Sequence, residues 1–328
     1  MILASLITLV IGSTILVPMI SQRRHHTTTN FLKCNFIMAL LILSIVTLCS
    51  SIYGIRENWF REQPACAFRA YAFTSMCMVI CTSFSIQALS RAFHVILVRH
   101  KILRTWGVHI IMVFLTWASS FLFQMVPFYF TSDFYRLELE SRCCVATTQH
   151  PFLALYSTST AFFIPMLIII FTYAMIFWAV RKTKHQIHVI DPIQPQMRTD
   201  RVVHRPLNIR RELKIMNQMM LQLGLTILSG SLYVILLMWQ LFARYNAPEL
   251  LYVLSIDAIV FGAMAIMLIL LIKNKNMIIE YFQRLIRKFR CCQNCFVTWM
   301  TDQTYNEIYF DSFSKTTIIF RESVVLIL

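Results

Sequence analysis

Long, uninterrupted stretches of apolar residues dominate the chain, and charged residues are confined to the segments between them. Crossing roughly 30 Å of hydrocarbon takes about 20 apolar residues in a helix that rises about 1.5 Å per residue. Stretches of about that length or longer occur at 2–20, 36–55, 67–97, 106–130, 152–180, 213–243 and 247–272. A transmembrane barrel would instead show alternating strands of about 10 residues. The pattern predicts an all-α membrane protein built as a bundle of seven transmembrane helices.

Composition supports the same class. Of the 328 residues, 58% are hydrophobic and 14% are charged, whereas soluble domains have roughly 45–50% apolar and ~25% charged residues. One water-soluble core cannot bury that excess. The sequence also contains no zinc-protease helix motif, phosphate-binding loop or dinucleotide fingerprint. We therefore expect a protein that is not an enzyme and that has no cofactor and no metal site.

Basic residues predict which way the chain crosses the membrane. Most of its 30 Lys and Arg residues follow the first, third, fifth and seventh stretches, and such residues concentrate in cytoplasmic segments. This places the N terminus outside and the C terminus in the cytoplasm of a multi-pass protein of the plasma membrane. The net charge of +15 then indicates membrane lipids as partners, and we expect no nucleic-acid binding.

The segment after the last stretch has a different pattern. Residues 276–290 combine apolar and basic side chains at helical spacing, which is typical of an amphipathic helix on the membrane surface. We expect a seven-helix domain over 1–290 and a cytoplasmic tail over 291–328. On the predicted cytoplasmic side, palmitoylation is favoured over disulfide formation for Cys291, Cys292 and Cys295.

Several residues recur at characteristic spacings within the seven-helix frame. Cys66 opens the third stretch, and Arg91 lies 25 residues later within Ser90-Arg91-Ala92. The other spaced positions are Trp59 seven residues before Cys66, Trp117 with Pro127 in the fourth stretch, and Pro165 with Tyr173 in the fifth. These spacings resemble those of the rhodopsin-like (class A) G-protein-coupled receptors. In that family Cys66 would occupy the disulfide position, and Arg91 would be the arginine of the Asp/Glu-Arg-Tyr motif.

The resemblance implies a disulfide between Cys66 and the loop 131–150. That loop contains two adjacent cysteines, Cys143 and Cys144, on the predicted oxidising side where disulfides persist. The bond would hold the loop across the mouth of the bundle. Cys144 is favoured and Cys143 is the alternative, and free cysteines are a third possibility.

The resemblance also implies a switch at the cytoplasmic end. An arginine in a membrane helix is costly unless it is paired or reaches the interface. Glu212, at the start of the sixth stretch, is the expected partner of Arg91 in the resting state. Movement of the sixth helix would free Arg91 for a G protein, with Tyr173 as its partner in the active state. In the alternative, Arg91 only contacts lipid phosphate.

The sixth and seventh helices depart from the family pattern. The family's Cys-Trp-x-Pro-Tyr falls on Ser229–Tyr233, and its Asn-Pro-x-x-Tyr falls on Ile266–Leu270. Without these prolines the usual cause of a helix kink is missing. A signalling route that differs from the family's, or a receptor-like protein that does not signal, therefore remains an alternative.

The ligand site is expected in the outer half of the bundle. Seven residues after Cys66, where amine-binding members carry aspartate, the chain has Phe73, so an aminergic receptor is disfavoured. Asp257 is an acid inside a predicted span, which makes it a site candidate, with pairing to a neighbouring polar side chain as the alternative. The remaining candidates are Met76, Tyr156 and Tyr233, although residues of these types at helical spacing more often pack in the core or face lipid.

Together these features predict a G-protein-coupled receptor. It would sense an unidentified extracellular ligand and signal through a cytosolic heterotrimeric G protein. The alternatives are a receptor-like scaffold without signalling and a seven-helix transporter or channel. The predicted spans lack the paired, broken helices typical of transporters.

Overall fold

The computed structural model describes residues 1–21, 27–55, 63–97, 100–131, 134–138, 143–146, 150–190, 200–243, 248, 250–284 and 286–287. Within 182–190 and 200–216 it describes the backbone alone. The contacts divide the chain into two units, Met1–Lys273 and Asn274–Leu328. The first unit holds the helix bundle.

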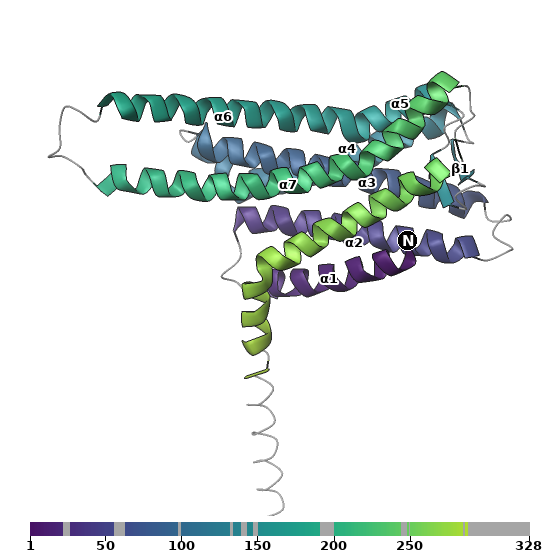
Figure 1. Ribbon diagram of the computed structural model, residues 1–328, viewed down its shortest axis with the longest axis horizontal. Coiled ribbons are helices and arrows are strands. Elements are labelled where there is room, and N and C mark those ends of the chain that lie inside the picture. The colour runs from purple at the N-terminus through teal and green to yellow at the C-terminus, as the bar shows by residue number, and fades with distance from the viewer. Residues whose placement is uncertain are drawn as a thin grey trace, which may run out of the picture. The chain divides into compact units, whose positions relative to one another are not determined.

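Seven helices in the described part of the chain are long and apolar enough to cross a membrane. Figure 1 shows those of the first unit running side by side. The fifth span is built from α5, one turn of π-helix (η4) and α6, and the short η3 (Lys101–Arg104) precedes α4. The spans are α1 (Ile2–Ser21), α2 (Thr28–Ile55), α3 (Gln63–Val95), α4 (Trp106–Phe130), α5 (Pro151–Thr158) with η4 (Ser159–Phe163) and α6 (Ile164–Ile190), α7 (Asp200–Ala243), and a last helix, Leu250–Arg284. The predicted seven-helix bundle is confirmed.

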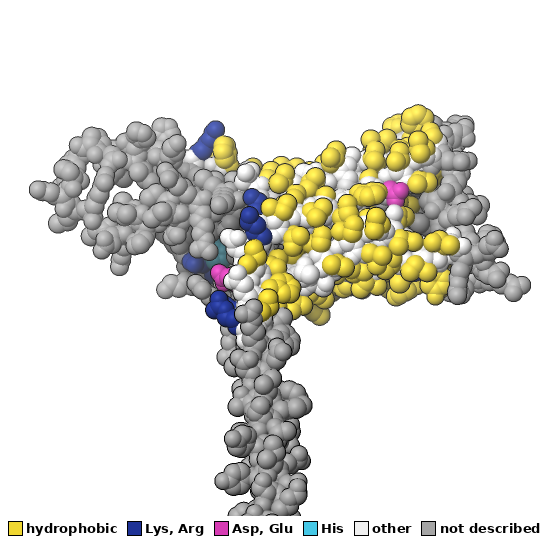
Figure 2. Space-filling model, turned by 60° about the horizontal axis from the view of Figure 1, so that its bottom comes forward, with side chains coloured by type: hydrophobic (Ala, Val, Ile, Leu, Met, Phe, Trp, Pro, Cys, Tyr) yellow, Lys and Arg dark blue, Asp and Glu magenta, His cyan; other side chains and the backbone are white. Residues whose placement is uncertain are grey.

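The surface of the bundle is apolar. Phe114 on α4, Ile170 on α6 and Leu228 on α7 are 70%, 61% and 68% exposed. Figure 2 shows hydrophobic side chains covering much of the visible side of the bundle. Soluble proteins rarely expose contiguous apolar patches of more than a few hundred Å². The chain is therefore a multi-pass membrane protein whose helices turn their large apolar side chains toward lipid.

Four helices extend well beyond the stretches predicted from the sequence. α2 begins at Thr28 rather than 36, α6 ends at Ile190 rather than 180, α7 begins at Asp200 rather than 213, and the last helix ends at Arg284 rather than 272. Hydropathy marks only the segment that meets lipid, whereas backbone hydrogen bonding continues into more polar residues.

The surface helix predicted over 276–290 is not confirmed as a separate element. In the second unit the described residues through Arg284 belong to the helix Leu250–Arg284, and Arg284 pairs with Glu280 at 3.3 Å. The predicted lipidation sites Cys291, Cys292 and Cys295 lie outside the described residues.

α3 is the central helix of the bundle. It packs against α2, α4, α6, α7 and the loop strands, and 67% of its apolar span is buried, compared with 22% for α4. The indole N–H of Trp117 on α4 donates to Asn35 Oδ1 at 2.8 Å, and the Asn35 amide donates to Ser83 Oγ at 3.0 Å. These bonds join α4, α2 and α3. The expected structural position of Trp117 thus has a physical role, while Asn35 and Ser83 carried no sequence signal.

A β-hairpin closes the end of the bundle at which α3 begins. Strands β1 (Tyr135–Glu138) and β2 (Cys143–Ala146) are antiparallel, with Leu137 opposite Cys144. Figure 1 shows β1 at the same end as α5. We call this the hairpin end, and the opposite end of α3 the Arg91 end. The sequence analysis predicted only a loop here, because strands this short leave too few residues for an alternating pattern.

The hairpin is held by a disulfide and by a buried tyrosine. Cys66 is bonded to Cys144, with their Cα atoms 5.3 Å apart, so the expected disulfide is present and uses Cys144 rather than Cys143. The hydroxyl of Tyr135 donates to the carbonyl of Gln124 on α4 at 2.7 Å. Burial raises the pKa of Tyr135, which keeps this hydroxyl protonated as a donor.

The first prediction concerns the close approach of α7 and the last helix. A Cβ added at Gly262 would lie 2.5 Å from Ser229 Cβ, so Gly262→Ala forces the two helices apart. We expect a loss of about 1–3 kcal/mol in stability, the usual range for overpacking, seen as a lower thermal midpoint of the purified protein. Gly107→Ala is the control, because nothing lies within 4 Å of its added Cβ. Equal midpoints for the two variants would contradict the close packing.

The second prediction separates the two adjacent cysteines. Neighbouring residues of a strand point to opposite faces, so only one of them can reach Cys66. Cys144→Ser should lower stability by about 2–5 kcal/mol, while Cys143→Ser should leave the thermal midpoint nearly unchanged. Non-reducing peptide mapping of the unaltered protein checks the pairing directly, and a Cys66–Cys143 peptide there would show that the assignment is wrong.

Candidate functional site

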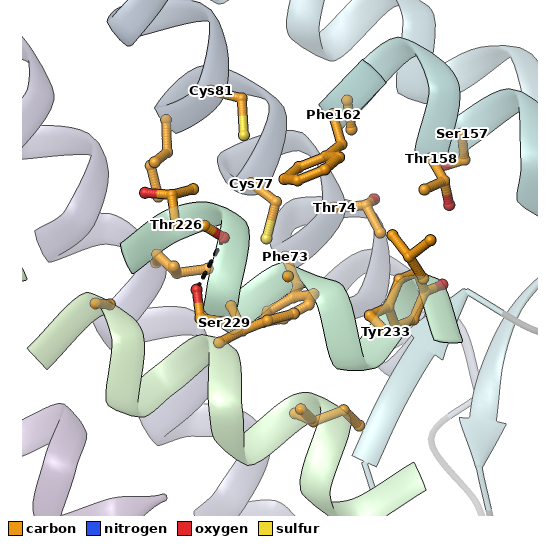
Figure 3. Close-up of a pocket in the computed structure, with 18 of the residues that line it drawn as sticks. Phe73, Thr74, Cys77, Cys81, Ser157, Thr158, Phe162, Thr226, Ser229 and Tyr233 are labelled. Carbon is orange, nitrogen blue, oxygen red and sulfur yellow. Dashed lines mark hydrogen bonds between the residues drawn. The ribbon is translucent and has the colours of Figure 1, made fainter. Parts of the chain in front are cut away.

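A cavity of about 120 Å³ lies inside the bundle, with walls from α3, the fifth span, α7 and the last helix and smaller contributions from α2 and β2. Figure 3 shows it as the space between these helices. A single water needs roughly 10–15 Å³ of such space. The cavity is therefore large enough for a small organic molecule.

The α3 wall is built from residues about one helical turn apart. Phe73, Cys77 and Cys81 line the cavity together with Thr74, and Figure 3 shows them along one face of α3. Positions i and i+4 of a helix share a face. Sequence reasoning selected Phe73 but neither cysteine. Their four-residue spacing from Phe73 is the signal that would have identified both.

The α7 wall contains the segment that replaces the family's proline motif. Thr226, Ser229, Gly230 and Tyr233 all line the cavity. Gly230 faces Phe162 of the π-helical turn, where an added Cβ would lie 3.2 Å from the ring. Single π-helical turns inside α-helices occur frequently at functional sites. The Ser229–Tyr233 segment thus forms part of a ligand-sized cavity.

Hydroxyl groups around the cavity make hydrogen bonds within the protein. Ser157 Oγ donates to Gln124 Oε1 at 2.6 Å, while Thr226 and Ser229 donate to backbone carbonyls of α7 at 3.0 and 3.1 Å. Figure 3 shows the last of these bonds as a dashed line. Gln124 is fully buried and also donates to Thr160 at 3.3 Å. No charged side chain occurs among the described residues that line the cavity.

The ligand-site candidates from the sequence are divided by the structure. Phe73 and Tyr233 line the cavity, whereas Met76 is 2% exposed within the core and Tyr156 is partly buried outside the lining. Asp257 also lies outside it: its carboxylate is 3.7 Å from the amino group of Met1. Hydropathy identifies a span but does not establish which face of a fully apolar helix points inward.

The Arg91 end brings together residues from four helices. Arg91 is buried, with 9% of its surface exposed, and interacts electrostatically with Lys33 on α2 and Tyr173 on α6. The Tyr173 hydroxyl lies 3.6 Å from Met219 Sδ on α7. The side chain of Glu212, the expected partner of Arg91, lies outside the described residues, as does Trp59. Of the other expected structural positions, Pro127 is buried, and the carbonyl of Pro165 accepts a bond from Ser85 on α3 at 3.1 Å.

The residue before Arg91 is held in the protein interior. Ser90 bonds His109 Nε2 at 2.9 Å, and His109 Nδ1 lies 2.9 Å from the carbonyl of Thr105. Because a carbonyl only accepts, Nδ1 carries the proton, and Nε2 then accepts from Ser90 in the neutral ring. The Ser90 hydroxyl therefore binds α4. No motif in the sequence marked Lys33 or His109.

Comparisons with known proteins agree with this architecture. The family model described as "7 transmembrane receptor (rhodopsin family)" matches residues 13–269. The 5-hydroxytryptamine receptors 1B of Cricetulus griseus and Homo sapiens are each 26% identical over 177 residues, which cover 53% of this chain and 45% of the relative. The matched region thus spans a little under half the length of these relatives.

A solved structure, that of squid rhodopsin, has the same fold. It superposes with a TM-score of 0.71 over 87% of this chain and 84% of the other, at 15% sequence identity. Identity this low establishes likeness of fold alone. The family model, however, covers well over half of the sequence, and the chain therefore belongs to the rhodopsin family of seven-transmembrane receptors.

Proposed function

We propose that this chain is a G-protein-coupled receptor that senses an extracellular ligand in the cavity and signals through a cytosolic heterotrimeric G protein. The observation that carries the proposal is the course of α7. The same helix supplies Ser229 and Tyr233 to the cavity and Met219 to the contact with Tyr173 near Arg91. A displacement of α7 by a ligand would therefore reach the surroundings of Arg91.

The charge pattern supports the orientation this function needs. Basic residues are concentrated in the connections at the Arg91 end, which favours a cytoplasmic position for that end. The hairpin end, with its Cys66–Cys144 disulfide, then faces the oxidising exterior, where such bonds persist. In the plasma membrane this orientation exposes the hairpin to extracellular ligands and the Arg91 end to G proteins.

In the proposed mechanism the resting state pairs Arg91 with Glu212. The segment 217–240 of α7 contains no proline, so α7 has no proline-induced kink there and the segment moves as one continuous helix. Its close contact at Ser229 with Gly262 provides a pivot, since small residues let helix backbones approach closely. Ligand binding beside Gly230 tilts α7, releases Arg91 from Glu212 and leaves Tyr173 as its neighbour.

The relatives described above are 5-hydroxytryptamine receptors. The lining of the cavity argues against the same ligand for this chain. Its cavity has Phe73 where the amine-binding members carry aspartate, and the described lining holds no carboxylate. A receptor-like scaffold that does not signal remains the second candidate, because the prolines of helices six and seven are absent.

The third prediction tests coupling through guanine-nucleotide exchange. The full chain in lipid nanodiscs should accelerate exchange on at least one member of a panel of purified heterotrimeric G proteins, relative to empty nanodiscs. Arg91→Ala should reduce that acceleration at least about tenfold, since a hydrogen bond to a charged group contributes about 1.5–3 kcal/mol and about 1.4 kcal/mol corresponds to tenfold. Glu212→Ala should raise basal exchange.

Two control variants separate a switch from an anchor. Arg104→Ala removes an exposed arginine on η3 and should leave exchange largely intact. Arg91→Lys keeps a charge that can contact lipid phosphate but loses the planar guanidinium. Full exchange by Arg91→Lys would favour the lipid anchor, and unchanged basal exchange by Glu212→Ala would contradict the resting pair. No exchange with any G protein would favour the scaffold.

A further inference from the structure

We infer that the cavity binds an uncharged, mostly apolar small molecule that carries one hydrogen-bonding group directed at Thr158. This inference rests on the proposed function, because it names the class of ligand for the same cavity. The charge, hydrogen bonding and shape of the cavity lining all support this class of ligand.

The described lining of the cavity offers no counter-charge to a charged ligand. Among the described residues that line the cavity, none is Asp, Glu, Lys, Arg or His. Asp257, the acid that the sequence placed in a span, lies beside the Met1 amino group and outside the lining. A charged ligand entering this space would lose its hydration without gaining a partner. Ammonium and carboxylate ligands are therefore both selected against.

Most hydroxyl groups of the cavity lining are already used in hydrogen bonds within the protein, so few remain for a ligand. Thr74 donates to a backbone carbonyl of α3, Ser157 donates to Gln124, and Ser229 donates to a carbonyl of α7. Thr158 also lines the cavity, and its hydroxyl makes no hydrogen bond with any residue in the described part of the chain. Figure 3 shows it on the fifth-span side. One polar group on the ligand can meet this hydroxyl, and most of the remaining lining is apolar.

The cavity walls present flat aromatic rings and polarisable sulfur atoms. Phe73 and Phe162 supply aromatic surface, and Cys77 and Cys81 present polarisable sulfur one turn apart. Such surfaces contact flat rings and alkyl groups favourably. Apolar cavities of comparable size stay dry and take up small aromatic molecules such as benzene. An aromatic or alicyclic molecule with a short alkyl chain fits these properties.

The experiment compares two probes that share an indole ring and differ in charge. 3-Propylindole is neutral, and tryptamine is a cation at neutral pH with nearly the same size. Cys77 faces the cavity and is a free cysteine, so its labelling by N-ethylmaleimide reports occupancy. The full chain is placed in lipid nanodiscs, and the labelling rate of each cysteine is followed by peptide mass spectrometry at millimolar probe.

We expect 3-propylindole to slow Cys77 labelling about fivefold, the protection given by about 80% occupancy. Tryptamine should slow it by less than about twofold, because its ammonium group would be desolvated without a partner. Cys49 is a built-in control: it is free, exposed on α2 and outside the cavity lining. Neither probe should protect it beyond the effect of membrane partitioning.

Three variants sharpen the result. Phe73→Asp adds a carboxylate to the α3 wall and should make tryptamine the better protector, whereas Phe73→Asn, without a charge, should not. Ala263→Phe fills space at the last-helix wall and should abolish protection by 3-propylindole. The comparison on the unaltered chain stands by itself if a variant fails to fold.

The inference is overturned if tryptamine protects Cys77 as well as 3-propylindole does, if neither probe protects it, or if Cys49 is protected equally. Because labelling involves no G protein, this result is independent of the exchange assay. A chain that excludes tryptamine but catalyses no exchange would keep the ligand class and lose the proposed signalling. A chain that catalyses exchange but is protected better by tryptamine would keep the proposed signalling and lose the proposed ligand class.

Discussion

A peptide group in the hydrocarbon of a bilayer must find its hydrogen-bond partner within the protein, because no water is available there. That constraint turns every apolar stretch of this chain into a helix, and it leaves the helix faces to be sorted by packing. Lipid is as apolar as leucine, so close approach and polar contacts, rather than hydrophobicity, hold the helices together. In this bundle, close approach occurs between Gly262 and Ser229. Polar contacts are the hydrogen bonds from Trp117 to Asn35 and from Asn35 to Ser83.

The bundle keeps the family's architecture while changing the interior that the architecture surrounds. Its superposition on squid rhodopsin at 15% identity shows that few particular side chains are needed for the fold. The positions at which the family has its helix-six motif serve this chain as a cavity wall, with Gly230 against Phe162 of the π-helical turn. The α7 wall of this cavity has no charged side chain among its described lining residues, and α7 has no proline between residues 217 and 240.

Much of the membrane architecture could be predicted, because it depends on one-dimensional patterns. Apolar length sets the number of helices, and the cysteine and tryptophan spacings indicated Cys66 and Trp117, which the structure places in a disulfide and in an interhelical hydrogen bond. Helix ends were less accurate at α2, α6 and α7, because hydropathy does not register helical turns that extend beyond lipid. The separate surface helix after the seventh span was not confirmed, since the described helix continues through Arg284.

The membrane class, the number of spans and the disulfide position of Cys66 could be read from the sequence, which also named Arg91, Phe73 and Tyr233 as candidate site residues. The fold was needed to show that Cys144 rather than Cys143 bonds Cys66, that Cys77, Cys81 and Gly230 line the cavity, and that Asp257 does not. The difference lies in the rotation of each helix about its own axis. A helix that is apolar on all sides carries no periodic signal for its inward face, so that face is set by which neighbours it packs against.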